Sequence, residues 1–338
     1  MSDADSCHNC RITYYNKEKN ILKQIRQMWD LIFDDPEEFA DYYFEHVCAA
    51  NRILLAYVGD EMVGMLHLNP YDICIGGKKS RCYYIVGVGV LQEYRRQGIM
   101  RKMMNQALAD MKKEGCPFTF LMPKIEEYYQ GFGFEKVYDT LELDIDISEL
   151  EEMVPDDLSG EEGYYLKHLS RMEEESEHAL AVLATQVNDA LSKRYDVYAH
   201  RTASYLDAME MEHRCQNGGV IAVYEDGKRL EDGMIEERLA GLFSYDVYDD
   251  TMYVERFESY DEHVRYVLDA AVRLAKASYC RRLVVTLAKK HFCDDIANVI
   301  GTSARMNDGH GIMAIGLNEN HTTIMENLKE RCFFDEIV

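Results

Sequence analysis

The hydrophobic positions of the first 150 residues switch between helical and strand spacing. Apolar residues at intervals of three and four predict helices over 17–31, 35–49 and 96–113. Short apolar runs separated by turn residues predict strands at 52–59, 61–69, 71–77, 82–91, 117–122 and 135–145, with a glycine-broken helical turn at 127–134. This order favours a mixed α/β (α+β) fold over a regularly alternating doubly wound sheet.

The second half of the chain repeats this order of elements. The acidic segment 148–163, which carries Pro155 and Gly160, predicts a domain boundary. Beyond it, periodicity predicts helices over 164–192, 201–214 and 260–278, and strands at 219–225, 239–247, 251–258, 283–288 and 311–317. We therefore expect one domain over 1–150, a second over 151–320 and a C-terminal tail over 321–338.

Charge and hydropathy exclude two classes of partner. The formal net charge of −24 argues against a nucleic-acid-binding face, which needs concentrated Lys and Arg, and would attract a cationic substrate. No apolar run approaches the roughly 18 residues that span a bilayer. The polar, acidic N-terminus lacks the apolar core of a signal peptide. We expect a cytoplasmic protein with no nucleic acid and no membrane among its partners.

The cysteines and histidines do not form a recognisable metal-binding pattern. Cys7 and Cys10 form one C-x-x-C around His8, and no second cysteine pair stands at zinc spacing. The histidines show no H-E-x-x-H or similar motif. The expectation is reduced thiols and no bound metal.

The segment after the strand at 82–91 carries the strongest chemical signal. A dinucleotide fingerprint fails there, because Gln92 stands where a third glycine should follow Gly87 and Gly89. The residues beyond are an alternative anion site, formed by Arg95, Arg96, Gln97, Gly98, Ile99, Met100 and Arg101. If a helix begins near Arg96, its unpaired amides favour an anion, and Gly98 permits close approach. Arginine side chains would add charged hydrogen bonds suited to a pyrophosphate. The alternative is a plain helix start with solvated arginines.

These residues resemble a known family. Arg95-x-x-Gly98 after Val88-Gly89-Val90 is similar to the acetyl-coenzyme A loop of GNAT-type N-acetyltransferases, although Met100 replaces the usual Gly or Ala. The variant is similar to that of the Eis-like branch.

Two further features resemble the Eis-like branch. Tyr129-x-x-Phe132-Gly133-Phe134 resembles its catalytic segment. The second half resembles its degenerate second GNAT domain, in which ESYDEH (258–263) stands where the arginine-glycine loop would be. The branch also has a third, sterol-carrier-like domain, for which the sequence shows no counterpart.

The resemblance implies a fold and a site. The fold would be two tandem GNAT domains, each a mixed, mostly antiparallel central sheet flanked by helices. Acetyl-coenzyme A would be the co-substrate, with the strands at 82–91 and 117–122 splayed around its pantetheine arm. The backbones of Val88 and Val90 would bind that arm beside Gly89, and Tyr129 would be the general acid. The carboxylate of Val338 would be the proton acceptor, on the pattern of the branch's C-terminus. Glu126, Glu127 or a chain of water molecules are the alternatives.

The expected function is acetyl transfer, by direct attack, to a primary amine. The acceptor would be a cationic small molecule or a lysine side chain of a peptide. The alternative is a coenzyme A-binding sensor or scaffold without turnover. Homo-oligomeric assembly is compatible with the resemblance.

Overall fold

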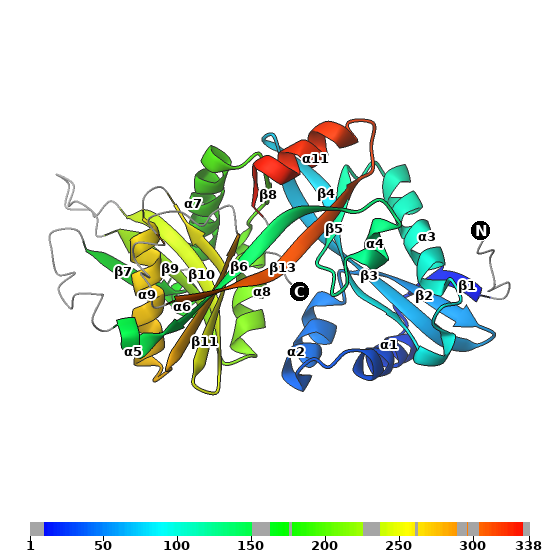
Figure 1. Ribbon diagram of the computed structural model, residues 1–338, viewed down its shortest axis with the longest axis horizontal. Coiled ribbons are helices and arrows are strands. Elements are labelled where there is room, and N and C mark those ends of the chain that lie inside the picture. Colours follow the sequence, from blue (N-terminus) through cyan, green and yellow to red (C-terminus); the bar gives the residue numbers. More distant parts are fainter. Residues whose placement is uncertain are drawn as a thin grey trace. The chain divides into compact units, whose positions relative to one another are not determined.

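The fold is described from a computed structural model that covers residues 10–150, 163–175, 178–225, 237–260, 263–288, 296 and 304–333 (Figure 1). The chain divides into two compact units. The first contains the chain up to Val137 and Ile312–Cys332, and the second contains Tyr138–Gly311. The domain boundary expected at residue 150 adjoins residues 151–162, which lie outside the described residues.

The first unit consists of a sheet with helices on both faces. Its strands are β1 (Cys10–Tyr14), β2 (Arg52–Val58), β3 (Glu61–Ile75), β4 (Lys78–Val90), β5 (Phe118–Leu121), the start of β6 (Glu135–Asp146) and the end of β13 (Ala304–Gly316). Its helices are α1 (Lys19–Ile32), α2 (Glu37–Tyr42), the π-helical turn η1 (Tyr43–Val47), the 3₁₀ turn η2 (Gln92–Tyr94), α3 (Ile99–Lys113), α4 (Glu127–Gln130) and α11 (His321–Glu330).

The strands of this unit pair in the order β1-β2-β3-β4-β5-β13. Neighbours are antiparallel except β4 and β5, which are parallel. Helix α1 packs against β3 and β4, while α3 contacts β1 through β4. The connection from β4 to β5 runs through α3, as a parallel pair requires.

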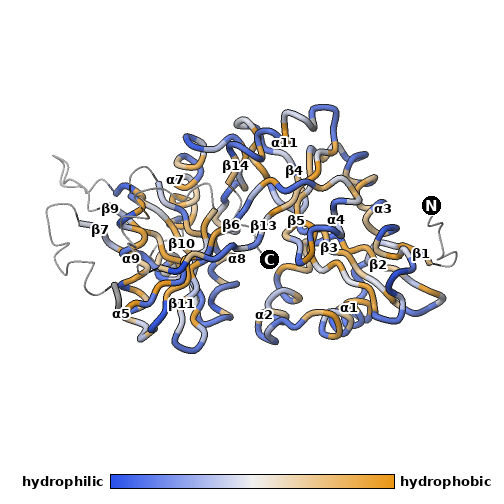
Figure 2. The backbone as a smooth tube through the Cα atoms, in the orientation of Figure 1, coloured by the Kyte–Doolittle hydropathy of each residue, from blue (hydrophilic) through white to orange (hydrophobic). Residues whose placement is uncertain are grey.

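Alternating side chains in β2 and β3 face different helices. Leu55 and Met65 belong to the core that contains Trp29 of α1. Gly64, on the other face, lies close to Met103 of α3, since a Cβ there would be 3.1 Å from the Met103 methyl carbon. Because both faces are covered, both strands are buried over most of their length, and the tube is hydrophobic along much of them (Figure 2).

The second unit repeats the same plan. Its strands are the rest of β6, β7 (Tyr164–His168), β8 (Val197–Ala199), β9 (Gly219–Glu225), β10 (Arg238–Tyr248), β11 (Thr251–Ser259), β12 (Arg282–Ala288) and the start of β13. The two-residue strand β14 (Cys332–Phe333) is divided between the units. Its helices are α5 (Ile147–Leu150), α6 (Leu169–Glu175), α7 (Ala179–Arg194), α8 (Ala203–Arg214) and α9 (Val264–Ala277).

Five neighbouring strands of the second unit pair in the order β12-β11-β10-β9-β7, with β6 beside β12. As in the first unit, an antiparallel run of three strands (β9, β10, β11) is followed by a helix (α9) and a strand (β12) parallel to the last of the run. The apolar face of α9 belongs to a hydrophobic core of this unit, with Val267 and Ala271 fully buried. The expected repeat of two mixed, mostly antiparallel sheets flanked by helices is thus confirmed.

Three expected elements differ in the structure. Residues 164–168 form β7, antiparallel to β9, where a helix was expected. The two strands expected at 61–69 and 71–77 are one continuous strand, β3. Helix α3 begins at Ile99, three residues later than Arg96. Arg96 and Gly98 have positive φ angles of 61° and 78°, which interrupt a right-handed helix.

Candidate functional site

Strands β4 and β5 separate after a short paired stretch. They pair only at Tyr83–Thr119 and Tyr84–Phe120, and the Thr119 hydroxyl donates a hydrogen bond of 2.7 Å to the Tyr83 carbonyl. Strand β5 ends at Leu121, whereas β4 continues to Val90. The β4 edge from residue 85 onward therefore has no β5 partner. The expected splay between the two strands is present.

A β-bulge lies in the part of β4 that has no β5 partner but still pairs with β3. Between the pairs His67–Val86 and Met65–Gly89, β4 has one more residue than β3. Gly87 adopts a φ of 58° in this bulge, and a Cβ there would lie 2.6 Å from a ring carbon of Trp29. A glycine is needed here because it tolerates the positive φ of the bulge and leaves room for Trp29 of α1. The extra residue of the bulge changes the direction of the neighbouring backbone N–H and C=O groups of β4.

The turn from β4 into α3 leaves the helix N-terminus open. Gly98 is the N-cap residue in the left-handed conformation, no side chain caps this end, and the first turn contains no acidic residue. A Cβ on Gly98 would meet no atom within 4 Å. The Gly98 carbonyl accepts the Lys102 amide at 3.0 Å, so the helix ladder starts there. The amides before Lys102 are those that an α-helix leaves without an intrahelical partner, and they favour an anion.

The three arginines of this segment have different surroundings. Arg95 donates from Nε to the Val90 carbonyl at 3.0 Å and so ties the loop to the end of β4. Arg96 is exposed beside the helix start. Arg101 places its guanidinium 5.9 Å from the centroid of the Phe132 ring. The loop is further held by Gln97, whose Nε2 donates to the Glu93 carbonyl at 3.2 Å.

Tyr129 lies on the short helix α4, three residues before Phe132, whose ring contacts Arg101. Its ring makes an edge-on contact with Phe134 at 6.0 Å between centroids. Burial raises the pKa of Tyr129 to about 12, so the phenol keeps its proton at neutral pH. Tyr128, its neighbour, is 60% exposed. Of the two adjacent phenols, Tyr129 is the one directed into the protein.

The two glutamates that precede Tyr129 and Tyr128 in the sequence are the acceptors considered for the amine proton. Glu126 is ion-paired with Lys136 at 2.6 Å, and Glu127 is exposed. Val338, the proton acceptor that the resemblance implies, lies outside the described residues, as does Cys7. The role of Val338 therefore stays a prediction.

A buried polar group beside the bulge was not anticipated from the sequence. His67 is fully buried, with Nδ1 at 3.0 Å from the Tyr43 hydroxyl. That hydroxyl accepts from Asn51 Nδ2 at 2.9 Å and donates to Asn69 Oδ1 at 3.2 Å. Burial lowers the pKa of His67 to about 3, so its ring is neutral. The available signal was His67 and Asn69 inside an otherwise apolar strand.

Sequence comparison identifies the family. Residues 14–137 match the profile of the acetyltransferase (GNAT) domain family. Over 121 residues the chain is 30% identical to N-alpha-acetyltransferase 50 of Danio rerio. The matched region covers 34% of this chain and 68% of that protein. The chain belongs to the GNAT family of N-acetyltransferases. It is accordingly an N-acetyltransferase that uses acetyl-coenzyme A as co-substrate.

Solved structures extend the GNAT likeness over both units. A GCN5-related N-acetyltransferase from Anabaena variabilis has a TM-score of 0.67 at 13% identity, covering 91% of this chain and 73% of that one. Eis1 from Mycobacterium abscessus has a TM-score of 0.57 at 13% identity, covering 90% and 72%. A tandem GNAT protein from the clavulanic acid biosynthesis pathway has 0.57 at 13% identity, covering 91% and 99%. At these identities the likeness concerns the fold, which matches a tandem GNAT chain almost end to end.

The residues of the first unit fit the co-substrate of a GNAT enzyme. An uncapped helix N-terminus without acidic neighbours suits a diphosphate, and an unpaired strand edge suits the amide groups of pantetheine. The second unit has no arginine-glycine segment between β11 and α9, where ESYDEH stands. Among the described residues, no helix is long and apolar enough to cross a membrane.

Proposed function

We propose that the first unit transfers the acetyl group of acetyl-coenzyme A directly to a primary amine. The acceptor is a cationic small molecule or a lysine side chain of a peptide. The observation that carries the proposal is the juxtaposition of the open α3 N-terminus with the unpaired edge of β4. The contact between Arg101 and Phe132 places the segment that follows Tyr129 beside the start of α3.

The diphosphate of the co-substrate binds at the start of α3. The amides of Gly98, Ile99, Met100 and Arg101 supply hydrogen bonds without a side chain blocking their approach at Gly98. Arg96 adds charge from the solvent side, and Gln97 lines the loop. Arg95 contributes by fixing the loop to Val90, because its Nε is engaged by that carbonyl.

The thioester lies along the β4 edge. The backbones of Val88, Gly89 and Val90 follow the bulge at Gly87, where the ladder with β3 is interrupted. The Val88 amide is the better candidate to polarise the thioester carbonyl, because it lies within the bulge. A backbone amide fixed in this way stabilises the oxyanion that forms on attack.

The reaction requires two proton transfers. The neutral amine nitrogen attacks the acetyl carbon, the carbon–sulfur bond breaks, and the sulfur leaves with the bonding electron pair. Tyr129 donates its phenolic proton to that sulfur, and the amine loses a proton to water or to a carboxylate. The raised pKa of Tyr129 keeps the proton available throughout the neutral range.

The chemistry of the acceptor follows from charge. The chain carries 61 acidic against 37 basic residues, so its field favours cationic ligands at low ionic strength. We further propose membership of the Eis-like branch, a cytoplasmic location and a homo-oligomeric assembly. The tandem arrangement of GNAT folds supports the first of these proposals.

The test is thiol release from acetyl-coenzyme A with a panel of polyamines, aminoglycosides and lysine peptides. Tyr129→Phe should lower kcat about 100-fold or more, as loss of a general acid does, while coenzyme A binding is retained. Tyr128→Phe, which changes an exposed phenol, is the matched control and should keep full activity. Equal activity of the two variants would refute the role of Tyr129. Tight coenzyme A binding without thiol release for any amine would favour the non-catalytic sensor.

A further inference from the structure

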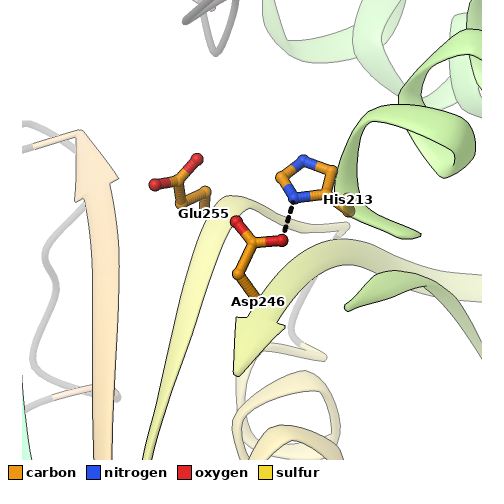
Figure 3. A group of neighbouring side chains, drawn as sticks. All are labelled: His213, Asp246 and Glu255. Carbon is orange, nitrogen blue, oxygen red and sulfur yellow. Dashed lines mark hydrogen bonds and ion pairs between the residues drawn. The ribbon is translucent and has the colours of Figure 1, made fainter. Parts of the chain in front are cut away.

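Three side chains from different elements of the second unit converge on one point (Figure 3). They are His213 of α8, Asp246 of β10 and Glu255 of β11, and their potential ligand atoms lie within 4.8 Å of one another. Nδ1 of His213 is 2.8 Å from Oδ1 of Asp246. His213 is buried, with only 1% of its surface exposed, and the two carboxylates are partly buried.

The register of the β10–β11 hairpin explains how the two carboxylates meet. Ser244 pairs with Glu255, and Asp246 lies two residues further along β10. Because side chains alternate along a strand, all three project from the same face of the hairpin. Helix α8 packs against β10 and brings His213 to that face. The juxtaposition depends on tertiary structure and is invisible in the spacing of these residues along the chain.

Ser244 adds a second, independent indication of a ligand. Its side chain is fully buried, and its hydroxyl oxygen has no hydrogen-bond partner in the described part of the chain. Leaving such a buried hydroxyl unsatisfied is destabilising. The hydroxyl lies on the face that carries both carboxylates, where a bound ion or its water would complete its hydrogen bonding.

Arg256 is the basic side chain that acts electrostatically on both carboxylates. Arg256 is within 3.0 Å of Glu212, with which it forms a buried ion pair. Glu255 accepts no hydrogen bond among the described residues. Two adjacent carboxylates in such surroundings are stable when a proton or a metal ion neutralises them.

We propose that His213, Asp246 and Glu255 bind a divalent first-row transition ion, with Zn²⁺ or Mn²⁺ as the fitting choices. One imidazole nitrogen with two carboxylate oxygens is a donor set for these ions, whereas Mg²⁺ and Ca²⁺ prefer oxygen alone. The nitrogen–oxygen separation of 2.8 Å suits two adjacent ligands of one ion. Three protein ligands leave positions for water, and Ser244 is placed to bond that water.

The ion would act as a cross-link within the second unit. It joins α8 to the β10–β11 hairpin, and its binding replaces the hydrogen bond between His213 and Asp246. This site lies outside the acetyl-transfer residues. It also departs from the expectation of a metal-free chain, because that expectation considered only ligands close together in sequence.

The test uses the full-length chain with Cys7 and Cys10 changed to Ser, so that the C-x-x-C thiols do not bind zinc. After treatment with a chelator, the protein is titrated calorimetrically with ZnCl₂, MnCl₂ and MgCl₂. We expect one equivalent of Zn²⁺ or Mn²⁺ and none of Mg²⁺. A metal concentration 100 times the Kd should raise the melting temperature of the second unit by roughly 5–10 °C.

Variants locate the ion. Glu255→Gln, a change of one atom, and Asp246→Asn should each lower affinity at least 10-fold. His46→Gln, which alters an exposed histidine 3.9 Å from Glu45, is the control and should bind normally. Anomalous diffraction from crystals of the unaltered chain soaked in ZnCl₂ provides a readout that does not depend on how variants fold. A peak between the three side chains would support the proposal. The absence of a peak, or unchanged affinity in the folded variants, would overturn it in favour of a shared proton.

Discussion

The guanidinium of Arg101 lies over the ring of Phe132, with 5.9 Å between Cζ and the ring centroid. Arg101 belongs to the first turn of α3, and Phe132 follows the helix that carries Tyr129. This contact connects the segment proposed to hold the diphosphate with the segment proposed to protonate the sulfur. The proposed function therefore implies that co-substrate binding and the position of Tyr129 are physically linked.

We expect Arg101→Gln to raise the Kd for coenzyme A about 10-fold or more. The variant keeps the backbone amide of residue 101 but loses the guanidinium charge at the helix start, together with the ring contact. Calorimetric titration with coenzyme A measures the effect. Arg11→Gln is the matched control, because Arg11 lies over the Tyr57 ring at 4.7 Å on β1. Similar affinities for both variants would argue against an anion site at α3.

Gly98→Ala should separate binding from stability. Gly98 has a φ of 78° in open surroundings, so a methyl group costs about 1 kcal/mol of unfolding free energy through backbone strain. The same methyl would meet the incoming diphosphate and should weaken coenzyme A binding more than 10-fold. Gly76→Ala, at a φ of 54° and with no atom within 4 Å, should cost similar stability and leave binding intact. Normal coenzyme A binding by Gly98→Ala would contradict the proposed approach of the diphosphate.

Gly87→Ala should destabilise the first unit by about 2–4 kcal/mol. Its Cβ would lie 2.6 Å from Trp29 and 3.2 Å from the His67 ring, and its φ of 58° adds strain. Urea unfolding followed by fluorescence measures this loss in the first unit, since Trp29 is the only tryptophan. Gly59→Ala, with a φ of 61° and open surroundings, isolates the backbone contribution. Equal losses in both variants would show that α1 does not pack against the bulge as described.

His67 should make the stability of the first unit depend on pH. Its pKa is about 3 when folded and about 6.5 in the unfolded chain, so the unfolded state takes up a proton between these values. The unfolding free energy should therefore fall by about 1.4 kcal/mol per pH unit as pH drops below 6.5. Two other titratable groups face its ring nitrogen, the Tyr43 hydroxyl and the Cys48 thiol, and burial raises the pKa of both. Both groups stay neutral in this range.

The measurement is the slope of unfolding free energy between pH 4.5 and 6.5, again by Trp29 fluorescence. The Trp29 and His67 rings lie 5.4 Å apart, so the probe reports the surroundings of the histidine. His67→Gln should reduce this slope by the contribution of about one proton taken up on unfolding, which is about 1.4 kcal/mol per pH unit. An unchanged slope in this variant would mean that another group takes up the proton.

Local pattern was sufficient for the elements that bury one clear face. Helix α3 and strand β4 were predicted within a few residues, because the spacing of apolar side chains reflects the face that meets the core. The Arg95–Gly98 segment was also recognisable, because an anion site at a helix start is made from consecutive residues. The family profile over 14–137 covers this segment, and its role as an anion site stays a prediction.

Features set by distant partners escaped the sequence. The sequence around Tyr164 and Tyr165 predicts a helix. In the structure this segment is the strand β7, because it pairs with β9. The delayed start of α3 follows from two positive φ angles, one of them at Arg96, a residue type that rarely adopts them.

The sequence by itself determined the tandem α/β plan and the position of the proposed diphosphate-binding turn, since both depend on neighbouring residues in the chain. Tertiary structure alone decided where β4 leaves β5, which polar groups support the bulge, and that His213 meets Asp246 and Glu255. These relationships join residues from separate elements. Strand register and helix packing bring such residues together, and periodicity carries no information about either.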